Sequence, residues 1–414
     1  MIFIMESMSA EHSAHLRPDL YADLPEKGFT PFLDSLMRHG LCFRQMYANG
    51  TRSIQAMPSV LGSIPSFRTP FVLMPQSLGR SRQLPAILAD RGYGTLFFCG
   101  SEHGSMGFGA YARSAGVERL ISREDYEAAH GTGDFDGYWG IWDEPFLQYA
   151  GEVLDSVPEP FFATLFTLSA HHPFVVPDAY AATLPAGYTK IHRGVAYDDE
   201  AFRRFFARYG GEAWFRRTIF VFVADHVSSE KFAPETRTYP GNMHILGFLY
   251  TPDGALQGEI GEVTQQLDIM PTLLGLLGCD EAYFAFGRDV LNEPARPRWS
   301  VSYDGGFRAL TGDTVLTFDD NGSQITPRTD RAATSAEVSG AEPAAKAAAG
   351  TKVAPEQAGK PSDAPVADAP AEKRLSAPGA NPTERSAEEL LGDFQASRAA
   401  ILHAHRKKEL YDTR

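Results

Sequence analysis

Apolar runs of strand length alternate with longer amphipathic segments along the first 290 or so residues of the chain. Runs rich in β-branched and aromatic residues predict strands at residues 1–5, 42–47, 94–99, 161–168, 219–224 and 245–250. Apolar residues at helical spacing predict helices at residues 30–37, 54–64, 84–91, 197–209 and 263–277. Runs that are apolar throughout, such as 219–224, are typical of parallel strands buried on both faces. The pattern therefore predicts an α/β fold with a mainly parallel central sheet flanked by helices.

The composition changes near Arg328, where the apolar runs stop. From there to residue 385 the chain consists mostly of Ala, Pro, Glu, Lys, Ser and Gly, which cannot bury enough apolar surface to fold. A capping box opens at Ser386, and apolar residues then fall on one helical face. We therefore expect one folded domain over residues 1–327, a disordered linker over 328–385 and a C-terminal helix over 386–414.

Charge and cysteine content narrow the range of partners. The net charge is −14 and no compensating basic face is visible, which argues against nucleic acid or an anionic membrane surface as a general partner. Three scattered cysteines form neither a disulfide framework nor a metal spacing. No apolar run reaches the roughly 18 residues needed to span a bilayer. A strand pattern that begins at residue 1 suggests that the natural sequence extends upstream.

Polar residues with metal-binding or nucleophilic side chains follow or precede several predicted strands. Glu6 follows the first strand, Asp225 and His226 follow the strand at 219–224, and His171 comes just after the strand at 161–168. His244 stands directly before the strand at 245–250. Because ligand sites of open α/β sheets lie beyond the carboxyl ends of the strands, these residues are expected at one edge. Each of them alone is more often a polar turn residue than part of a site.

Ser53 completes a plausible reaction centre. It lies in a tight turn before the helical segment at 54–64, where helix N–H groups favour an anion. Glu6, Ser53, Asp225 and His226 offer two carboxylates, a hydroxyl and an imidazole, a ligand set that suits Zn or Mn. A metal bound to the Ser53 hydroxyl would make it a nucleophile towards phosphorus.

Two further histidines from the predicted strand ends fit the same chemistry. His171 and His244 could hold the non-bridging phosphoryl oxygens or protonate the leaving group.

Seven segments together resemble the alkaline phosphatase and sulfatase superfamily, in particular its lipoteichoic acid synthase-like or phosphoglycerol transferase-like branch. The similarity extends over about residues 2–289. Its motifs are the first-strand metal motif at 3–7, a Thr-Pro-x-Leu-Asp-x-Leu segment at 30–36, the nucleophile turn at 47–53, His-x-Pro at 171–173, the metal motif at 222–226, the later active-site His244, and a helix signature at 266–277.

The resemblance implies a metal-dependent phosphotransferase or hydrolase that acts on phosphoglycerol-type diesters of lipids or glycans. Mn or Zn would be held by Glu6, Ser53, Asp225 and His226, and Ser53, His171 and His244 would be catalytic. It also implies a location at the cell membrane with the catalytic domain on the extracytoplasmic side.

Two alternatives stay open. Sulfatases need Cys or Ser in a Cys/Ser-x-Pro-x-Arg context, and residues 63–68 come near it, with Arg68 one position late. The other alternative is a catalytically silent domain that binds lipid headgroups or a partner protein.

One loop departs from the resembled branch. Near residues 100–108 lipoteichoic acid synthases carry a His, a Trp and an Arg that help bind glycerol phosphate, and this chain has Cys99, Met106 and Phe108 instead. Farther along the chain, the aromatic segment at 134–144 contains Tyr138 and Trp139. It suits either a wall of the substrate site or a surface turn.

Overall fold

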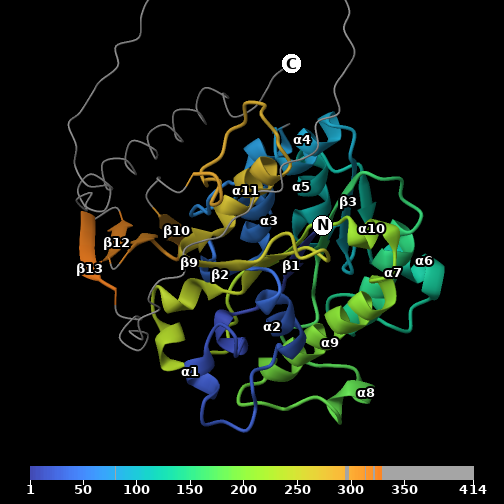
Figure 1. Cartoon of the computed structure of the whole chain (residues 1–414), viewed down its shortest axis with the longest axis horizontal. Coiled ribbons are helices and arrows are strands. Elements are labelled where there is room, and N and C mark those ends of the chain that lie inside the picture. The colour runs from blue at the N-terminus through green and yellow to red at the C-terminus, as the bar shows by residue number, and fades with distance from the viewer. Residues whose placement is uncertain (80, 294–297, 313, 320–321, 329–414) are drawn as a thin grey trace, which may run out of the picture.

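A computed structural model describes residues 1–79, 81–293, 298–312, 314–319 and 322–328. Within these residues the larger sheet has nine strands in the order β4-β3-β5-β1-β6-β8-β2-β7, and β9 also pairs with β2 (Figure 1). Its strands are β1 (Ile2–Met5), β2 (Leu41–Tyr47), β3 (Gly94–Cys99), β4 (Arg119–Ile121), β5 (Phe161–Phe166), β6 (Phe220–Ala224), β7 (His244–Ile245), β8 (Gly247–Tyr250) and β9 (Gly258–Gln265).

Strand β1 lies at the centre of this sheet, parallel to both of its neighbours. Phe3 is opposite Leu165 of β5 on one side and Phe222 of β6 on the other. All four residues of β1 and all five of β6 are buried, as the continuous apolar runs require. Antiparallel pairing is confined to β7 and β8 with their partners. The predicted α/β fold with a mainly parallel sheet is confirmed.

Helices cover both faces of the sheet. Figure 1 shows α3, α4, α5 and α11 above the central strands and α2 and α9 below them. The helices are α1 (Pro18–Tyr21), α2 (Pro31–Arg38), α3 (Ser53–Gly62), α4 (Leu84–Asp90), α5 (Phe108–Ser114), α6 (Arg123–His130), α7 (Asp143–Leu154), α8 (Asp178–Ala181), α9 (Ile191–Tyr209), α10 (Ala213–Arg216) and α11 (Ile269–Leu276).

Aromatic packing fixes α9 against the sheet. The Phe3 ring lies 5.0 Å from Phe202 of α9 and 4.9 Å from Phe222 of β6, measured between centroids. Such pairs add about 0.5–1.5 kcal/mol beyond the area that they bury. This packing holds β1 and β6 in register, and so fixes where their carboxyl ends emerge.

One predicted helix was wrong at its start. Residues 263–265 of the expected helix 263–277 belong to strand β9, and the α-helix begins only at Ile269, after a 3₁₀ turn η7 (Gln266–Asp268). Pairing of β9 with β2 decides this segment, because Thr264 and Gln265 lie opposite Met46 and Tyr47. Helix α9 also begins earlier than expected, at Ile191.

A second sheet follows, which the sequence patterns did not reveal. It is antiparallel, with strands β10 (Trp299–Tyr303), β11 (Phe307–Thr311), β12 (Thr314–Asp319) and β13 (Gly322–Pro327). Strand β10 lies against β9, and the Tyr303 N–H donates to the Asn49 carbonyl at 3.2 Å. The small sheet therefore supports the turn that carries Ser53.

Two expectations fall on residues outside this description. The predicted linker, from residue 329 onward, and the whole C-terminal helix at 386–414 lie outside the described residues. Among the helices that are described, none is long and apolar enough to cross a membrane.

Candidate active site

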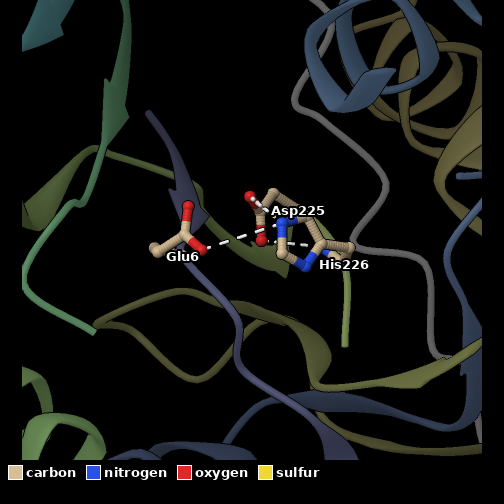
Figure 2. Close-up of side chains that lie close together, drawn as sticks. All are labelled: Glu6, Asp225 and His226. Atoms are coloured by element: carbon tan, nitrogen blue, oxygen red, sulfur yellow. Dashed lines mark hydrogen bonds and ion pairs between the residues drawn. The ribbon is translucent and has the colours of Figure 1, made fainter. Parts of the chain in front are cut away.

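Two carboxylates and an imidazole meet at the carboxyl ends of adjacent parallel strands. Glu6 directly follows β1, and Asp225 directly follows β6. The His226 Nε2 lies 3.7 Å from Glu6 Oε1 and 3.3 Å from Asp225 Oδ2 (Figure 2). One ligand atom from each of the three residues lies within 4.8 Å of the others. The ends of β1 and β6 thus bring together residues that are more than 200 positions apart in the chain.

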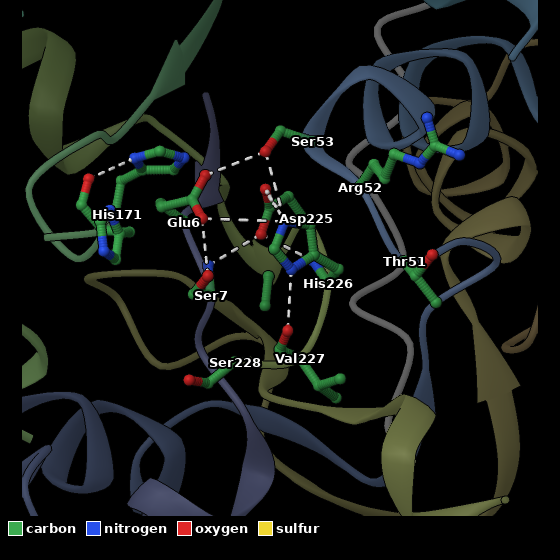
Figure 3. Close-up of polar contacts among 12 residues, drawn as sticks. Glu6, Ser7, Thr51, Arg52, Ser53, His171, Asp225, His226, Val227 and Ser228 are labelled. Atoms are coloured by element: carbon green, nitrogen blue, oxygen red, sulfur yellow. Dashed lines mark hydrogen bonds and ion pairs between the residues drawn. The ribbon is translucent and has the colours of Figure 1, made fainter. Parts of the chain in front are cut away.

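Ser53 joins this cluster from the first position of α3. Its Oγ lies 3.1 Å from Glu6 Oε2 and 3.2 Å from His226 Nε2 (Figure 3). The side chain is almost fully buried. The unpaired N–H groups of a helix N-terminus favour negative charge beside this hydroxyl.

The ring of His226 is held in the tautomer that a ligand needs. Its Nδ1 lies 2.8 Å from the Val227 carbonyl, which can only accept, so Nδ1 carries the proton. In the neutral ring Nε2 then has a free lone pair, and this is the nitrogen that faces Ser53 and the two acids. A hydrogen bond from the other ring nitrogen is the usual way in which proteins orient metal-binding histidines.

The buried acidic groups of the cluster favour the binding of a cation. Burial raises the pKa of Asp225 to about 8, and the nearby Glu6 carboxylate adds to the effect. Burial lowers the pKa of His226, but the charges of Asp225 and Glu6 outweigh it and the net shift is upward. Asp225 Oδ2 is buried and receives no hydrogen bond from the described residues. This orphaned oxygen and the O,O,N donor set fit a divalent ion such as Zn or Mn.

Ser7 organises the two acids, a role that the sequence did not reveal. Its Oγ donates to Glu6 Oε1 at 2.6 Å and its N–H donates to Asp225 Oδ1 at 2.8 Å. The residue adopts a left-handed φ of 56°, which is costly for a non-glycine residue and is often found at functional sites. One strained residue thus orients both carboxylates.

The buried side-chain amide of Gln266 connects the turn at residues 49–53 to the end of strand β6. Its Oε1 accepts the Asn49 N–H at 3.0 Å, while its Nε2 donates to the carbonyls of Ala224 and Asp225, both at 2.7 Å. Gln266 opens the helix signature at 266–277, which showed no catalytic residue in the sequence. Its hydrogen bonds join the turn before Ser53 to the end of β6.

His171 lies beside the cluster. In Figure 3 it stands on the opposite side of Glu6 from His226. Asp143 fixes the loop before it, because its carboxylate accepts the Leu168 N–H at 2.9 Å and the Ser169 N–H at 2.6 Å. The described candidate ligands within 4.8 Å of one another do not include His171. A role for His171 at the substrate phosphate stays a prediction.

His244 lies against strand β2. Its Nε2 donates to the Arg44 carbonyl at 3.0 Å, and its ring stacks on Tyr47 with centroids 5.3 Å apart. It too is outside the described ligand cluster. A role for His244 at the phosphoryl oxygens stays a prediction.

Ser63 serves a structural role at the end of α3. It is fully buried, its Oγ donates to the Leu267 carbonyl at 2.8 Å, and it accepts the Gly287 N–H at 2.8 Å. Both of these partners are backbone groups. Ser63, the serine nearest to a sulfatase motif, thus uses its hydroxyl in two structural hydrogen bonds to the backbone.

The three positions that depart from the resembled branch differ in exposure. Cys99 and Phe108 are buried, and only Met106, at 36% exposure, reaches the surface. Burial raises the pKa of the Cys99 thiol to about 11. The residues at these positions therefore offer no cation to a phosphate.

The fold is that of the alkaline phosphatase superfamily, whose members are transferases or hydrolases of phosphate or sulfate esters. The chain belongs to the Sulfatase family, whose model matches residues 1–279. Among curated proteins it is similar to the lipoteichoic acid synthase-like YvgJ of Bacillus subtilis, with 26% identity over 226 residues that cover 49% of this chain and 35% of that protein. The lipoteichoic acid synthase of Staphylococcus aureus strain USA300 is 25% identical over 177 residues, 37% of this chain and 26% of that protein. The chain thus matches about a third or less of the length of these relatives.

Solved structures show the same fold. A protein in the alkaline phosphatase superfamily from Vibrio parahaemolyticus superposes with a TM-score of 0.68 and 26% identity, covering 79% of this chain and 81% of that one. The lipoteichoic acid synthase LtaP from Listeria monocytogenes superposes with a TM-score of 0.66 and 20% identity, covering 79% and 84%.

Proposed function

We propose that this chain is a divalent-metal-dependent transferase or hydrolase of phosphate esters, acting on phosphoglycerol-type diesters of lipids or glycans. The observation that carries the proposal is the position of Ser53 Oγ, 3.1 Å from Glu6 and 3.2 Å from His226 at a helix N-terminus. A hydroxyl within reach of a base and of metal ligands is the arrangement of an activated nucleophile. The similarity to proteins named lipoteichoic acid synthase supports the phosphoglycerol class.

The metal would be held by Glu6, Ser53, Asp225 and His226, and Mn and Zn both suit this set. When bound, a divalent ion supplies Lewis acidity that favours the ionised hydroxyl and offsets the charge of the phosphoryl group. Ser7 and Gln266 keep the ligands in place by the hydrogen bonds described above.

The chain's own groups carry the transfer. Ser53 Oγ, ionised by loss of its proton to solvent, attacks phosphorus, so that an Oγ–P bond forms and the bond from phosphorus to the leaving alcohol breaks. N–H groups at the start of α3 face the negative charge that develops, and His171 gives a proton to the departing alkoxide or holds a phosphoryl oxygen. An acceptor hydroxyl, or water, then gives a proton to His171 and attacks the phosphorus bound to Ser53 Oγ. The Oγ–P bond breaks and Ser53 is released. The site suits either acceptor, so both transfer and hydrolysis are part of the proposal.

By the same resemblance, we propose action at the extracytoplasmic side of the cell membrane, on a lipid or glycan substrate.

The deciding experiment compares Ser53→Ala with Ser63→Ala on a chromogenic phosphodiester and an aryl sulfate, with Mn or Zn added. We expect diester turnover by the wild type, a loss of at least about a thousandfold in Ser53→Ala, and near-normal turnover in Ser63→Ala once folded. Ser63→Ala is the matched control, because it removes a buried hydroxyl that supports the same helix.

Other results would redirect the proposal. Diester turnover that survives in Ser53→Ala would refute the nucleophile assignment. Turnover of the aryl sulfate alone would favour a sulfatase, and bound metal without turnover of either compound would favour a binding domain.

A further inference from the structure

The loop that joins α6 to α7 is unusually well fixed for a surface segment. One oxygen of Asp136 accepts three backbone N–H groups, from Tyr138 at 2.7 Å, Trp139 at 2.8 Å and Gly140 at 3.1 Å. The Ile141 N–H donates to the Gly100 carbonyl at 2.9 Å, which ties the loop to the end of β3. A loop held at both its tip and its base can place a side chain accurately.

The side chain that this loop places is Trp139. Its Nε1 donates to Ser105 Oγ at 2.9 Å, which fixes the rotation of the indole. Its ring lies against His171, with centroids 4.6 Å apart and planes inclined at 55°. The hydrogen bond to Ser105 therefore holds the indole, and the ring contact of the indole holds the His171 imidazole.

The orientation of His171 is fixed from the other side as well. Its Nδ1 lies 2.8 Å from the His172 carbonyl, which can only accept, so Nδ1 carries a proton and donates a hydrogen bond to that carbonyl. Figure 3 shows the second ring nitrogen on the side of the ring that faces Glu6 and Ser53. The ring is exposed, and without a neighbour it would be free to rotate away from that direction.

We propose that Trp139 is a positioning residue for the phosphoryl transfer, holding the His171 imidazole so that Nε2 faces the group attacked by Ser53. The inference rests on the proposed function, since it assigns His171 to that reaction. An aromatic face suits this task, because it restricts the ring without competing for either nitrogen and is compatible with both charge states. Tyr138, next in the chain and 63% exposed, has no corresponding contact with His171 among those described.

The test uses the full chain with ¹³C-labelled histidine rings, and the His171 signal is assigned by its loss in His171→Gln. In Trp139→Ala we expect the His171 ring signals to move more than those of any other histidine, since the indole ring current is removed. We also expect kcat/KM for a chromogenic phosphodiester to fall about ten- to a hundredfold, the scale for a misplaced catalytic group. Trp139→Phe keeps an aromatic face and should restore most of both properties.

Two further variants guard against a general loss of structure. Tyr138→Ala changes the same loop and should leave the His171 signals in place. Ser105→Ala removes only the acceptor of the indole N–H and should produce a smaller shift of the same kind, which serves if Trp139→Ala does not fold.

The outcomes separate the two proposals. Unmoved His171 signals and wild-type kcat/KM in Trp139→Ala, with Ser53→Ala inactive, would overturn the positioning role alone. Full turnover in Ser53→Ala would overturn the proposed function instead. Full turnover in His171→Gln would overturn the positioning role, because there would be no catalytic imidazole to position.

Discussion

Ser53 Oγ and His226 Nε2 lie 3.2 Å apart, although 173 residues separate them in the chain. Because the Nδ1 proton of His226 is donated to the Val227 carbonyl, Nε2 can only accept in the neutral ring. The Ser53 hydroxyl therefore has two acceptors, this nitrogen and Glu6 Oε2. Ser53, the proposed nucleophile, therefore lies among the groups that would take its proton or hold the metal.

Metal removal should destabilise the protein. Without a cation, burial and the Glu6 charge make the ionised form of Asp225 unfavourable and raise its pKa to about 8. An ion at about 100 times its dissociation constant stabilises the fold by about 2.7 kcal/mol. We expect a chelator to lower Tm and added Mn or Zn to restore it. Calorimetry in both conditions measures the effect.

Asp225→Asn provides the control for this prediction. Its amide oxygen can still accept the N–H groups of Ser7 and His226, while the carboxyl whose ionisation is unfavourable beside Glu6 is lost. In chelator the variant should melt at or above the wild-type temperature, and added metal should hardly change it. A full response of this variant to metal would contradict the assignment of Asp225 as a ligand.

Gln266→Ala should impair both stability and turnover. The substitution removes three buried hydrogen bonds and leaves the Asn49 N–H and two carbonyls unsatisfied, at a cost of about 2–4 kcal/mol. Since these bonds connect the turn of Ser53 with the end of β6, we also expect kcat/KM to fall at least about tenfold below the melting transition. Urea unfolding and diester turnover measure the two effects.

Gln257→Ala is the matched control, because that side chain is exposed and its loss should change stability by no more than about 0.5 kcal/mol. If Gln266→Ala were as stable and active as this control, the connecting role of Gln266 would be wrong.

The buried acids Asp143 and Asp198 should make stability depend on pH. Burial raises the pKa of Asp143 to about 6, and burial together with the Asp143 charge raises the pKa of Asp198 well above its ordinary value. Carboxyls with raised pKa values bind more protons in the folded state than in the unfolded state. Their contribution to stability is therefore largest at acidic pH and is lost as the pH rises from about 4 through those values.

Asp198→Asn should remove much of this dependence. The amide can donate to Asp143 without a shared proton, so the variant should gain on the order of 1 kcal/mol over the wild type at pH 8 and little at pH 5. Urea midpoints at the two pH values test this, with the exposed Asp178→Asn as a control. An equal change at both pH values would show that the pair does not titrate as described.

The sequence by itself determined the class of fold and which residues could form the cluster of Glu6, Ser53, Asp225 and His226. Apolar runs specify buried parallel strands, and parallel strands bring their carboxyl ends to one edge, which is why Glu6 and Asp225 could be expected together. The signals were local in each case: an apolar run followed at once by an acid.

Tertiary structure alone decided the rest, because the deciding contacts join distant segments. The strand at 263–265 exists through pairing with β2, and Gln266 acquires its role through Asn49 and Asp225. The contact of the Trp139 ring with His171 likewise depends on a loop held by β3. No local pattern encodes such partners, since hydrogen-bond and ring geometry become defined only when the whole sheet has formed.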